Sequence, residues 1–385
     1  MIIKSQLSIA LFAVLLMFSI SSVTGNGSFG YTIKGKILNQ ETGAPIPLAE
    51  VFISGTTYGS ISDDNGEFQL QTSYLPCLLV VSHISYAPFN MLIDAESITY
   101  MTIKLIPYEH EIEELTVESM NMRKQNLKLF KKAFLGTDEI AISCTILNDS
   151  VISFRWDSMV FSASAYQPVM IDNPKLGYRI MVIIEDFKLI YDLETYNQIR
   201  KHKKMKPDVA GAVYQILCNY HFIQYPQEER RKQKRIENTR LRVYYGSRMH
   251  FLRALYSENP KKHGYFVGTD FDSIPITPYI DMDSWPGKKI IFLDPEGYPD
   301  KQLIYPEESM IIQYYEDYSG RPQNLNNNIR TDKDWIPLQT ELTILSKDCI
   351  IRSNGTTFDY SMLFTGYIGK QKIAGMLPDD FMLED

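Results

Sequence analysis

The stretch "GTTYGSISDDNGEFQL", residues 55–70, decides how the N-terminal part of the chain folds. Its segment Asp63-Asp64-Asn65-Gly66 has a composition that suits either a calcium-binding loop or the turn of a β-hairpin. A calcium loop of the EF-hand type, with glycine at position 6, needs oxygen ligands at positions 1 and 12. Those positions hold Ile61 and Thr72, so the bidentate acid is missing. The sequence therefore predicts a type I′ hairpin turn with its Asn-Gly pair at positive φ.

Short segments around this turn alternate between apolar and polar side chains, as expected for strands with one buried face. Ile33 and Ile37 share one face of their segment, and Phe68 and Leu70 share one face of theirs. The run "CLLVVS", residues 77–82, is apolar throughout and is typical of a strand buried on both faces. Strands of this length, separated by glycine-containing turns, predict a small β-sandwich over residues 31–107.

The N-terminal segment resembles the carboxypeptidase regulatory-like domain, whose fold is a seven-stranded, transthyretin-like β-sandwich. Ser85 stands where the family usually has glycine, in the stretch "SHISY". The resemblance implies a fold and no activity, because the matching residues are turn and core positions. They are Gly35, Gly43, Pro45, Ala49, Val51, Gly55, Thr56, Gly59, Asp63, Gly66, Phe68 and Leu70.

The C-terminal part predicts a larger, β-rich α+β domain over residues 120–385, joined to the sandwich by an acidic linker at 108–119. Helical periodicity marks residues 121–136, where Leu127, Phe130 and Phe134 share a face, and residues 246–256, where Ser247 is suited to the N-cap. The predicted fold class is therefore mainly β. Strand-like segments cover 151–156, 178–193, 211–225, 288–294, 301–306, 309–315 and 340–346.

This region resembles the downstream half of exported carboxypeptidase regulatory-like proteins from Gram-negative, Bacteroidota-type envelopes. The resemblance rests on Phe134-Leu135-Gly136, Leu176-Gly177-Tyr178, Gly246-Ser247 and His250-Phe251-Leu252-Arg253. The same sandwich precedes the plug of TonB-dependent outer-membrane receptors. The 266 residues after Ser119 are fewer than a receptor plug and barrel need, so we expect a different second domain.

The N-terminus reads as a secretory signal over residues 1–25, with an uncleaved membrane anchor as the alternative. Lys4 precedes a short apolar run, and no later run reaches the length of a spanning helix, so no transmembrane helix is expected after processing. The expected location is periplasmic, outer-membrane associated or secreted. Four cysteines, Cys77, Cys144, Cys218 and Cys349, could form one or two disulfides or remain as buried thiols.

No motif predicts catalysis, a cofactor or a metal site. His110 and Glu113 have the spacing of two zinc ligands, but a tetrahedral site needs at least three from the protein. Cys218 with His221 reads as core packing, and His250 with Arg253 as a structural pair. Four acids near Pro and Gly read as surface turns rather than paired catalytic carboxylates; they are Asp270, Asp272, Asp281 and Asp283.

Charge is uneven along this acidic chain of net charge −7, because residues 119–260 hold 23 basic and 14 acidic side chains. This excess is interpreted first as a solvated face or as attraction between the basic middle and the acidic flanks within the fold. The alternative is a polyanion partner, which for an exported protein would be anionic lipid headgroups or acidic polysaccharide rather than nucleic acid. The expected function is a non-enzymatic binding or scaffold module with an envelope protein or glycan as partner. The alternatives are a hydrolase with an unrecognised site in residues 120–385 and an accessory part of a TonB-dependent uptake system. The densest basic cluster is Arg230, Arg231, Lys232, Lys234 and Arg235.

Overall fold

The N-terminal strands form two stacked sheets in the computed structural model. One sheet has the order β4-β1-β7, in which β1 (Tyr31–Asn39) pairs antiparallel with β4 (Glu67–Thr72) and parallel with β7 (Tyr100–Leu105). The other has the order β3-β2-β5-β6, formed by Gly59–Ile61, Glu50–Ile53, Cys77–His83 and Tyr86–Ile93. The structure describes residues 30–94, 100–108, 120–201, 209, 211–226, 229–257, 259–268, 301–302, 309–317, 320–325, 337–345, 349–357 and 362–383.

The two sheets enclose the first apolar core, which confirms the predicted seven-stranded sandwich. Ile33 and Ile37 of β1 are fully buried against Leu79 and Val81 of β5 in this core. The alternating burial of β4 puts Phe68 and Leu70 inward, as its sequence predicts. The continuous apolar run of β5 has side chains in contact on both of its faces, because the outer face packs against the second domain.

The segment Asp63-Asp64-Asn65-Gly66 forms a turn, but this turn is not the predicted type I′ hairpin turn. It joins β3 of one sheet to β4 of the other, so its flanking strands are not partners. Positive φ occurs at Gly66 (+73°) and not at Asn65. The Asp63 carboxylate accepts from the backbone N–H groups of Asn65, at 2.9 Å, and Glu67, at 2.8 Å. Asp63 therefore closes an Asx-type turn, and the predicted pair of positive φ angles was wrong.

A six-stranded sheet begins the second domain. Its order is β8-β11-β12-β10-β9, and β13 also pairs with the long strand β12. The strands are β8 (Thr145–Ile146), β9 (Ile152–Asp157), β10 (Val160–Ala165), β11 (Val169–Asn173), β12 (Tyr178–Tyr191) and β13 (Ala212–Gln224). The predicted strands at 151–156, 178–193 and 211–225 are confirmed within one or two residues.

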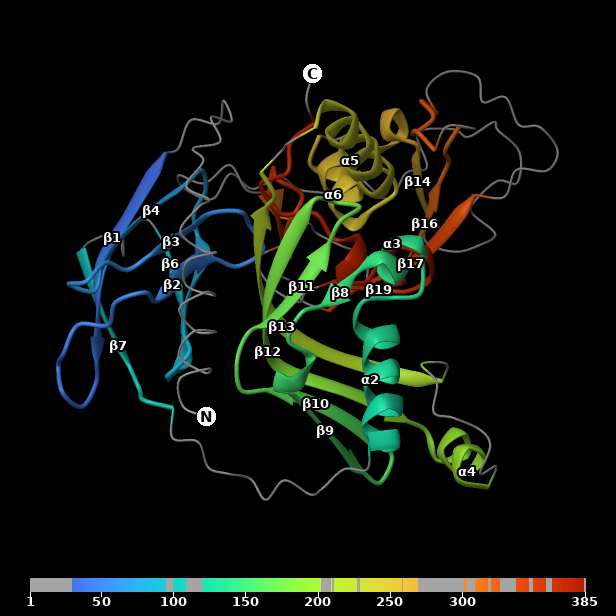
Figure 1. Cartoon of the computed structure of the whole chain (residues 1–385). Coiled ribbons are helices and arrows are strands. Elements are labelled where there is room, and N and C mark those ends of the chain that lie inside the picture. The colour runs from blue at the N-terminus through green and yellow to red at the C-terminus, as the bar shows by residue number, and fades with distance from the viewer. Residues whose placement is uncertain are drawn as a thin grey trace.

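Helix α2 (Met120–Phe134) covers the face of this sheet that lies away from the sandwich (Figure 1). Phe130 and Phe134 are buried and pack against Phe187 of β12. Leu129 is buried where Leu127 is only half-buried, so the apolar face is turned slightly from the predicted stripe. The helix therefore docks on its own domain.

The remaining elements form a third unit with its own core. Helix α5 (Arg230–Tyr244) precedes α6 (Arg248–Tyr256), whose Phe251, Leu252 and Leu255 are buried as predicted. The Ser247 hydroxyl accepts from the N–H of His250 and is the predicted N-cap. The sheet has the order β14-β16-β17-β19, formed by Tyr265–Gly268, Met310–Tyr314, Leu338–Ile344 and Met362–Phe364.

Smaller elements complete the described chain. Strands β15 (Lys301–Gln302) and β18 (Ile350–Ile351) form a separate pair. The predicted strand at 301–306 is described only in its first two residues, and the one at 288–294 lies outside the described residues. The short helices are α3 (Glu139–Ser143), η1 (Asp149–Val151), α4 (Leu193–Lys201), η2 (Pro260–His263), α7 (Gly366–Gly369) and η5 (Ile373–Gly375).

The sandwich docks on the sheet of the second domain, so that three sheets and α2 form successive layers (Figure 1). Phe52 and Val80 from the outer face of the sandwich pack against Met181 and Ile183 of β12. Met181 and Ile183 thus face the sandwich, while Ile180 and Val182 face the core under α2. The register shift between Ile184 and Asp186 reverses this alternation, so Phe187 faces α2.

Backbone hydrogen bonds strengthen this junction along the outer edge of β13. Gly55 donates its N–H to the carbonyl of Tyr220 at 2.8 Å, and Phe222 donates to the carbonyl of Thr56 at 2.9 Å. The N–H of Asp379 in turn donates to the carbonyl of Gly55 at 2.8 Å. The loop between β2 and β3 therefore pairs with the edge of β13 and is itself held by the C-terminal segment.

None of the described helices is long and apolar enough to cross a membrane. All four cysteines are described, and each is a free thiol. Cys77, Cys218 and Cys349 are buried and Cys144 is half-buried, so the chain takes the buried-thiol alternative.

Candidate binding site on helix α5

The five basic residues singled out in the sequence occupy the first two turns of α5. All five side chains are exposed. The opposite face of the helix carries Ile236, Arg240 and Tyr244, which are buried. The helical period therefore separates a packed face from a basic face that is directed to solvent.

The basic residues lie where the electrostatics of a helix disfavour them. The first turn of α5 holds no acidic residue, and the N-cap Glu229 makes no side-chain capping hydrogen bond. Cations near a helix N-terminus meet the positive end of the helix dipole. Arg230 and Lys234, like Arg231 and Arg235, are also like charges four residues apart, which repel. None of the five forms an ion pair with any residue that the structure describes.

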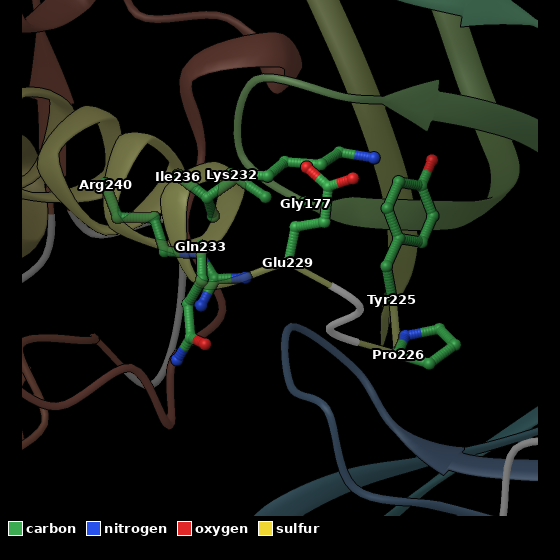
Figure 2. A pocket seen from close by; sticks show the side chains of 8 residues that line it. All are labelled: Gly177, Tyr225, Pro226, Glu229, Lys232, Gln233, Ile236 and Arg240. Atoms are coloured by element: carbon green, nitrogen blue, oxygen red, sulfur yellow. The ribbon is translucent and has the colours of Figure 1, made fainter.

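A pocket of about 310 Å³ lies beside this basic face, between α5, the end of β13 and the turn before β12 (Figure 2). In Figure 2 the polar ends of Glu229, Lys232 and Tyr225 point to one side of the pocket, and those of Gln233 and Arg240 point to the other. The lining therefore offers both hydrogen-bond donors and acceptors, and two cations against one carboxylate. It consists of Gly177, Tyr225, Pro226, Glu229, Lys232, Gln233, Ile236 and Arg240.

Arg240 is the buried cation of this pocket. Its Nε donates to the carbonyl oxygen of Leu176 at 2.8 Å, and its guanidinium carbon lies 4.0 Å from the ring centroid of Tyr178. A cation over an aromatic face is held in a fixed plane. These two contacts position the guanidinium before any ligand arrives.

Gly177 allows α5 to approach the turn that holds Arg240. Its φ is +68°, and a Cβ there would come within 2.9 Å of the Ile236 side chain. A larger residue would be strained by the positive φ and would force the Ile236 side chain to shift. The Leu-Gly-Tyr motif at residues 176–178 therefore has a role in packing α5 against the turn before β12.

A polar group extends the pocket along the sandwich-facing side of the sheet. The Tyr225 hydroxyl donates to the Asp172 carboxylate, which lies 3.6 Å from the guanidinium of Arg179. Burial and the Asp172 carboxylate raise the pKa of Tyr225, so its phenol stays protonated at neutral pH. Tyr225 thus presents a neutral ring to the pocket.

A second set of titratable groups lies at the sandwich junction, and two of them, Asp379 and Asp380, were not predicted from the sequence. Burial, with Asp380 as a smaller cause, raises the pKa of Asp379 to about 7. Asp380 accepts hydrogen bonds from the N–H and the hydroxyl of Thr57. Burial lowers the pKa of His221, which stacks on Phe52, to about 4. These groups are engaged in holding the two domains together.

The residues considered for catalysis do not converge. Cys218 lies on the α2 side of β13 and His221 on the sandwich side, so the two side chains do not face each other. Burial raises the pKa of the Cys218 thiol to about 12, which leaves it a poor nucleophile.

His250 and Arg253 serve the third core, as predicted from the sequence. His250 is surrounded by tyrosine rings, and burial lowers its pKa to about 3. Arg253 donates to the backbone carbonyls of Asn354 and Phe381, which fixes the C-terminal segment.

The remaining candidates cannot be placed. Within the described part of the chain, no three His, Cys, Asp or Glu side chains are grouped to hold a metal ion. The His110 and Glu113 pair lies outside the described residues, as do Asp270, Asp272, Asp281 and Asp283.

Residues 33–129 match the family model of the CarboxypepD_reg-like domain, in agreement with the resemblance in the sequence. The chain is also 29% identical over 145 residues to the TonB-dependent receptor SusC of Bacteroides thetaiotaomicron. That match spans 37% of this chain and 14% of the receptor, so the chain covers about one-seventh of that relative.

Two solved structures from Bacteroides align with about half of the chain at low similarity. A proposed carbohydrate-binding protein from Bacteroides uniformis is 12% identical, covers 50% of this chain and 79% of its own, and has a TM-score of 0.17. A DUF3823 family protein from Bacteroides ovatus is 12% identical, covers 51% and 82%, and has the same TM-score of 0.17. Scores this low carry no argument about fold or ligand.

Proposed function

We propose that this chain is a non-enzymatic, exported binding module of the cell envelope that holds an anionic polymer on the basic face of α5. The carrying observation is the position of five exposed cations in the first two turns of one helix, unpaired with any described residue. Such charges do not stabilise the fold. They do provide a local field that attracts a polyanion, although the whole chain is acidic.

Backbone hydrogen bonds between the domains support this proposal, because they would keep the basic face on a rigid scaffold. The sandwich, the central sheet and the C-terminal segment are linked by backbone hydrogen bonds at Gly55 and Thr56. Helix α5 follows β13, the strand at which these links are made. A surface on a rigid scaffold loses little conformational entropy when a ligand binds.

The envelope location and a TonB-dependent partner belong to this proposal. The signal-like residues 1–25 would direct export. The partial match to the SusC receptor supports work in the same compartment. In this proposal the chain acts beside an outer-membrane uptake system as an accessory component that retains a polymer near it.

Charge reversal tests the proposal. The full chain is passed over immobilised polygalacturonate and over vesicles with 30% phosphatidylglycerol, at two salt concentrations. The paired change Arg230→Glu with Arg231→Glu should weaken retention on the bound polymer about tenfold or more, since each reversal replaces attraction by repulsion. The matched change Lys124→Glu with Lys128→Glu, on exposed positions of α2, alters net charge equally. It should shift retention less than threefold.

Three results would overturn this function. The wild-type chain would bind neither surface, or both pairs of changes would weaken binding equally, which would show an effect of net charge alone. Retention on vesicles without retention on polygalacturonate would assign the surface to lipid and exclude the polymer.

A further inference from the structure

We infer that the pocket beside α5 binds one carboxylated sugar unit of an acidic polysaccharide; this inference rests on the proposed function and names its ligand. A polymer lying on the exposed basic face would place one unit in the pocket, because Lys232 belongs to both surfaces. The pocket volume of about 310 Å³ lies at the lower end of the range for small-molecule sites. It therefore suits one unit rather than a long stretch of polymer.

The cations of the pocket select a carboxylate. Arg240 is held in a fixed plane by the Leu176 carbonyl and the Tyr178 ring. A planar guanidinium matches the two oxygens of a carboxylate better than a spherical charge does. Lys232, at the rim, adds a second positive charge to the same lining.

The acceptors of the pocket require a ligand that also donates hydrogen bonds. Glu229 places a carboxylate in the lining, and Gln233 adds an amide oxygen. Inorganic phosphate carries its hydroxyl groups on the same atom as its charge, so a hydrogen bond from it to Glu229 also brings its charged oxygens beside that carboxylate, which repels them. The hydroxyl groups of a sugar donate to such acceptors. The mixture of two cations and one carboxylate thus favours a sugar acid over a simple anion.

The apolar part of the lining suits the carbon skeleton of a sugar ring. Pro226 and Ile236 contribute aliphatic surface, and Tyr225 contributes an aromatic ring. The hydroxyl of that ring donates to Asp172, which orients it. A ring so fixed provides a flat contact surface at low entropic cost.

The test measures binding of trigalacturonate, maltotriose and inorganic phosphate to the full chain by titration calorimetry. The wild type should bind trigalacturonate at least tenfold more tightly than either of the others. Lys232→Gln and Lys234→Gln remove the same charge from the same helix, but only Lys232 lines the pocket. The loss of trigalacturonate affinity should be at least fivefold greater for Lys232→Gln.

The acidic side chain of the rim provides a second variant. Glu229→Gln removes the repulsion toward phosphate without removing a cation, so it should narrow the preference for trigalacturonate over phosphate by about fivefold. Glu229 is exposed and makes no capping hydrogen bond, so the change leaves the fold intact.

The outcomes separate this inference from the proposed function. The pocket assignment is wrong if Lys232→Gln and Lys234→Gln lose equal trigalacturonate affinity, or if phosphate binds as tightly as trigalacturonate. Polymer binding by the exposed basic face would not be contradicted by either result. If the wild type binds neither trigalacturonate nor polygalacturonate, both the sugar-acid pocket and the proposed polymer binding are wrong. Binding confined to anionic vesicles would replace the sugar acid by a lipid headgroup.

Discussion

At the scale of single residues, the structure separates the roles of Asp63 and Gly66, which the sequence shows side by side. Asp63 closes the turn through its carboxylate, whereas Gly66 supplies the positive φ. A Cβ at Gly66 would lie 2.4 Å from the carbonyl oxygen of Ile37. The turn therefore packs against β1.

Replacing Gly66 by alanine should destabilise the sandwich by about 3 kcal/mol, from the strain of a left-handed residue together with the clash at Ile37. Gly43 is the matched control, because its φ is +69° and nothing lies within 4 Å of its Cβ position. Gly43→Ala should cost only about 1 kcal/mol. Urea unfolding measures both changes. Equal costs would show that the chain relaxes around Gly66 without loss.

Particular residues also show how far the sequence alone could reach. The strands around Ile33 and Phe68 follow from local alternation, because burial on one face imposes a period of two. The type I′ turn was wrongly predicted, because turn type depends on whether the flanking strands pair, and here they belong to different sheets. Asp379 was not predicted at all. Its contact with Gly55 joins residues more than 300 positions apart, which no local pattern reveals.

At the scale of elements, α5 has a packed face and an electrostatically unfavourable end. Its exposed cations could be found from composition, because five basic residues within six positions need no tertiary information. The pocket could not be found that way, since it requires Gly177 and Tyr225 from other elements. Helix α5 thus carries a basic face that the sequence predicts, next to a pocket that forms only when distant elements pack together.

Reversing the charge at the start of α5 should stabilise the protein. Arg230→Glu with Arg231→Glu places acids at the N-terminus, and it converts two repelling pairs into attractive ones with Lys234 and Arg235. The expected gain is about 1 kcal/mol, seen as a higher thermal midpoint at low salt that narrows at high salt. The control change Lys124→Glu with Lys128→Glu keeps one repelling pair and gains one attractive pair with Lys132, so it should raise the midpoint less than the α5 change does.

The opposite result would reassign the basic face. A fall in the thermal midpoint for the α5 change would show that these cations make stabilising interactions with acidic groups elsewhere in the chain. The same variant would then lose binding through loss of structure, and the retention experiment would no longer identify a ligand surface.

At the scale of the whole molecule, the domains are joined around the outer edge of β13. The β2–β3 loop, β13 and the C-terminal segment form a continuous hydrogen-bonded junction through Gly55 and Asp379. Phe52 packs beneath it against His221. Closing a strand edge in this way removes a site for aggregation and fixes the sandwich to the domain that carries α5.

The pKa of Asp379 makes this junction depend on pH. Its value is raised to about 7 in the folded protein from 3.8, so between these values the folded state binds more protons than the unfolded state. Stability from this group is therefore greatest below about pH 4 and is lost as pH rises toward 7. His221 acts in the opposite direction, because its pKa is lowered from 6.5 to about 4 and its contribution is lost on acidification across that range.

Asp379→Asn isolates the carboxylate, because asparagine resembles the protonated acid and does not titrate. Subtracting the free energy of unfolding of the wild type from that of the variant cancels His221 and leaves Asp379 together with its electrostatic coupling to Asp380. The difference should move in favour of the variant by roughly 1–2 kcal/mol between pH 4.5 and pH 8, after partial solvent screening is allowed for. Urea titrations at four pH values measure it. A difference that stays constant with pH would show that the pKa of Asp379 is the same in the folded and unfolded chain. The junction would then take up no proton through this group on folding.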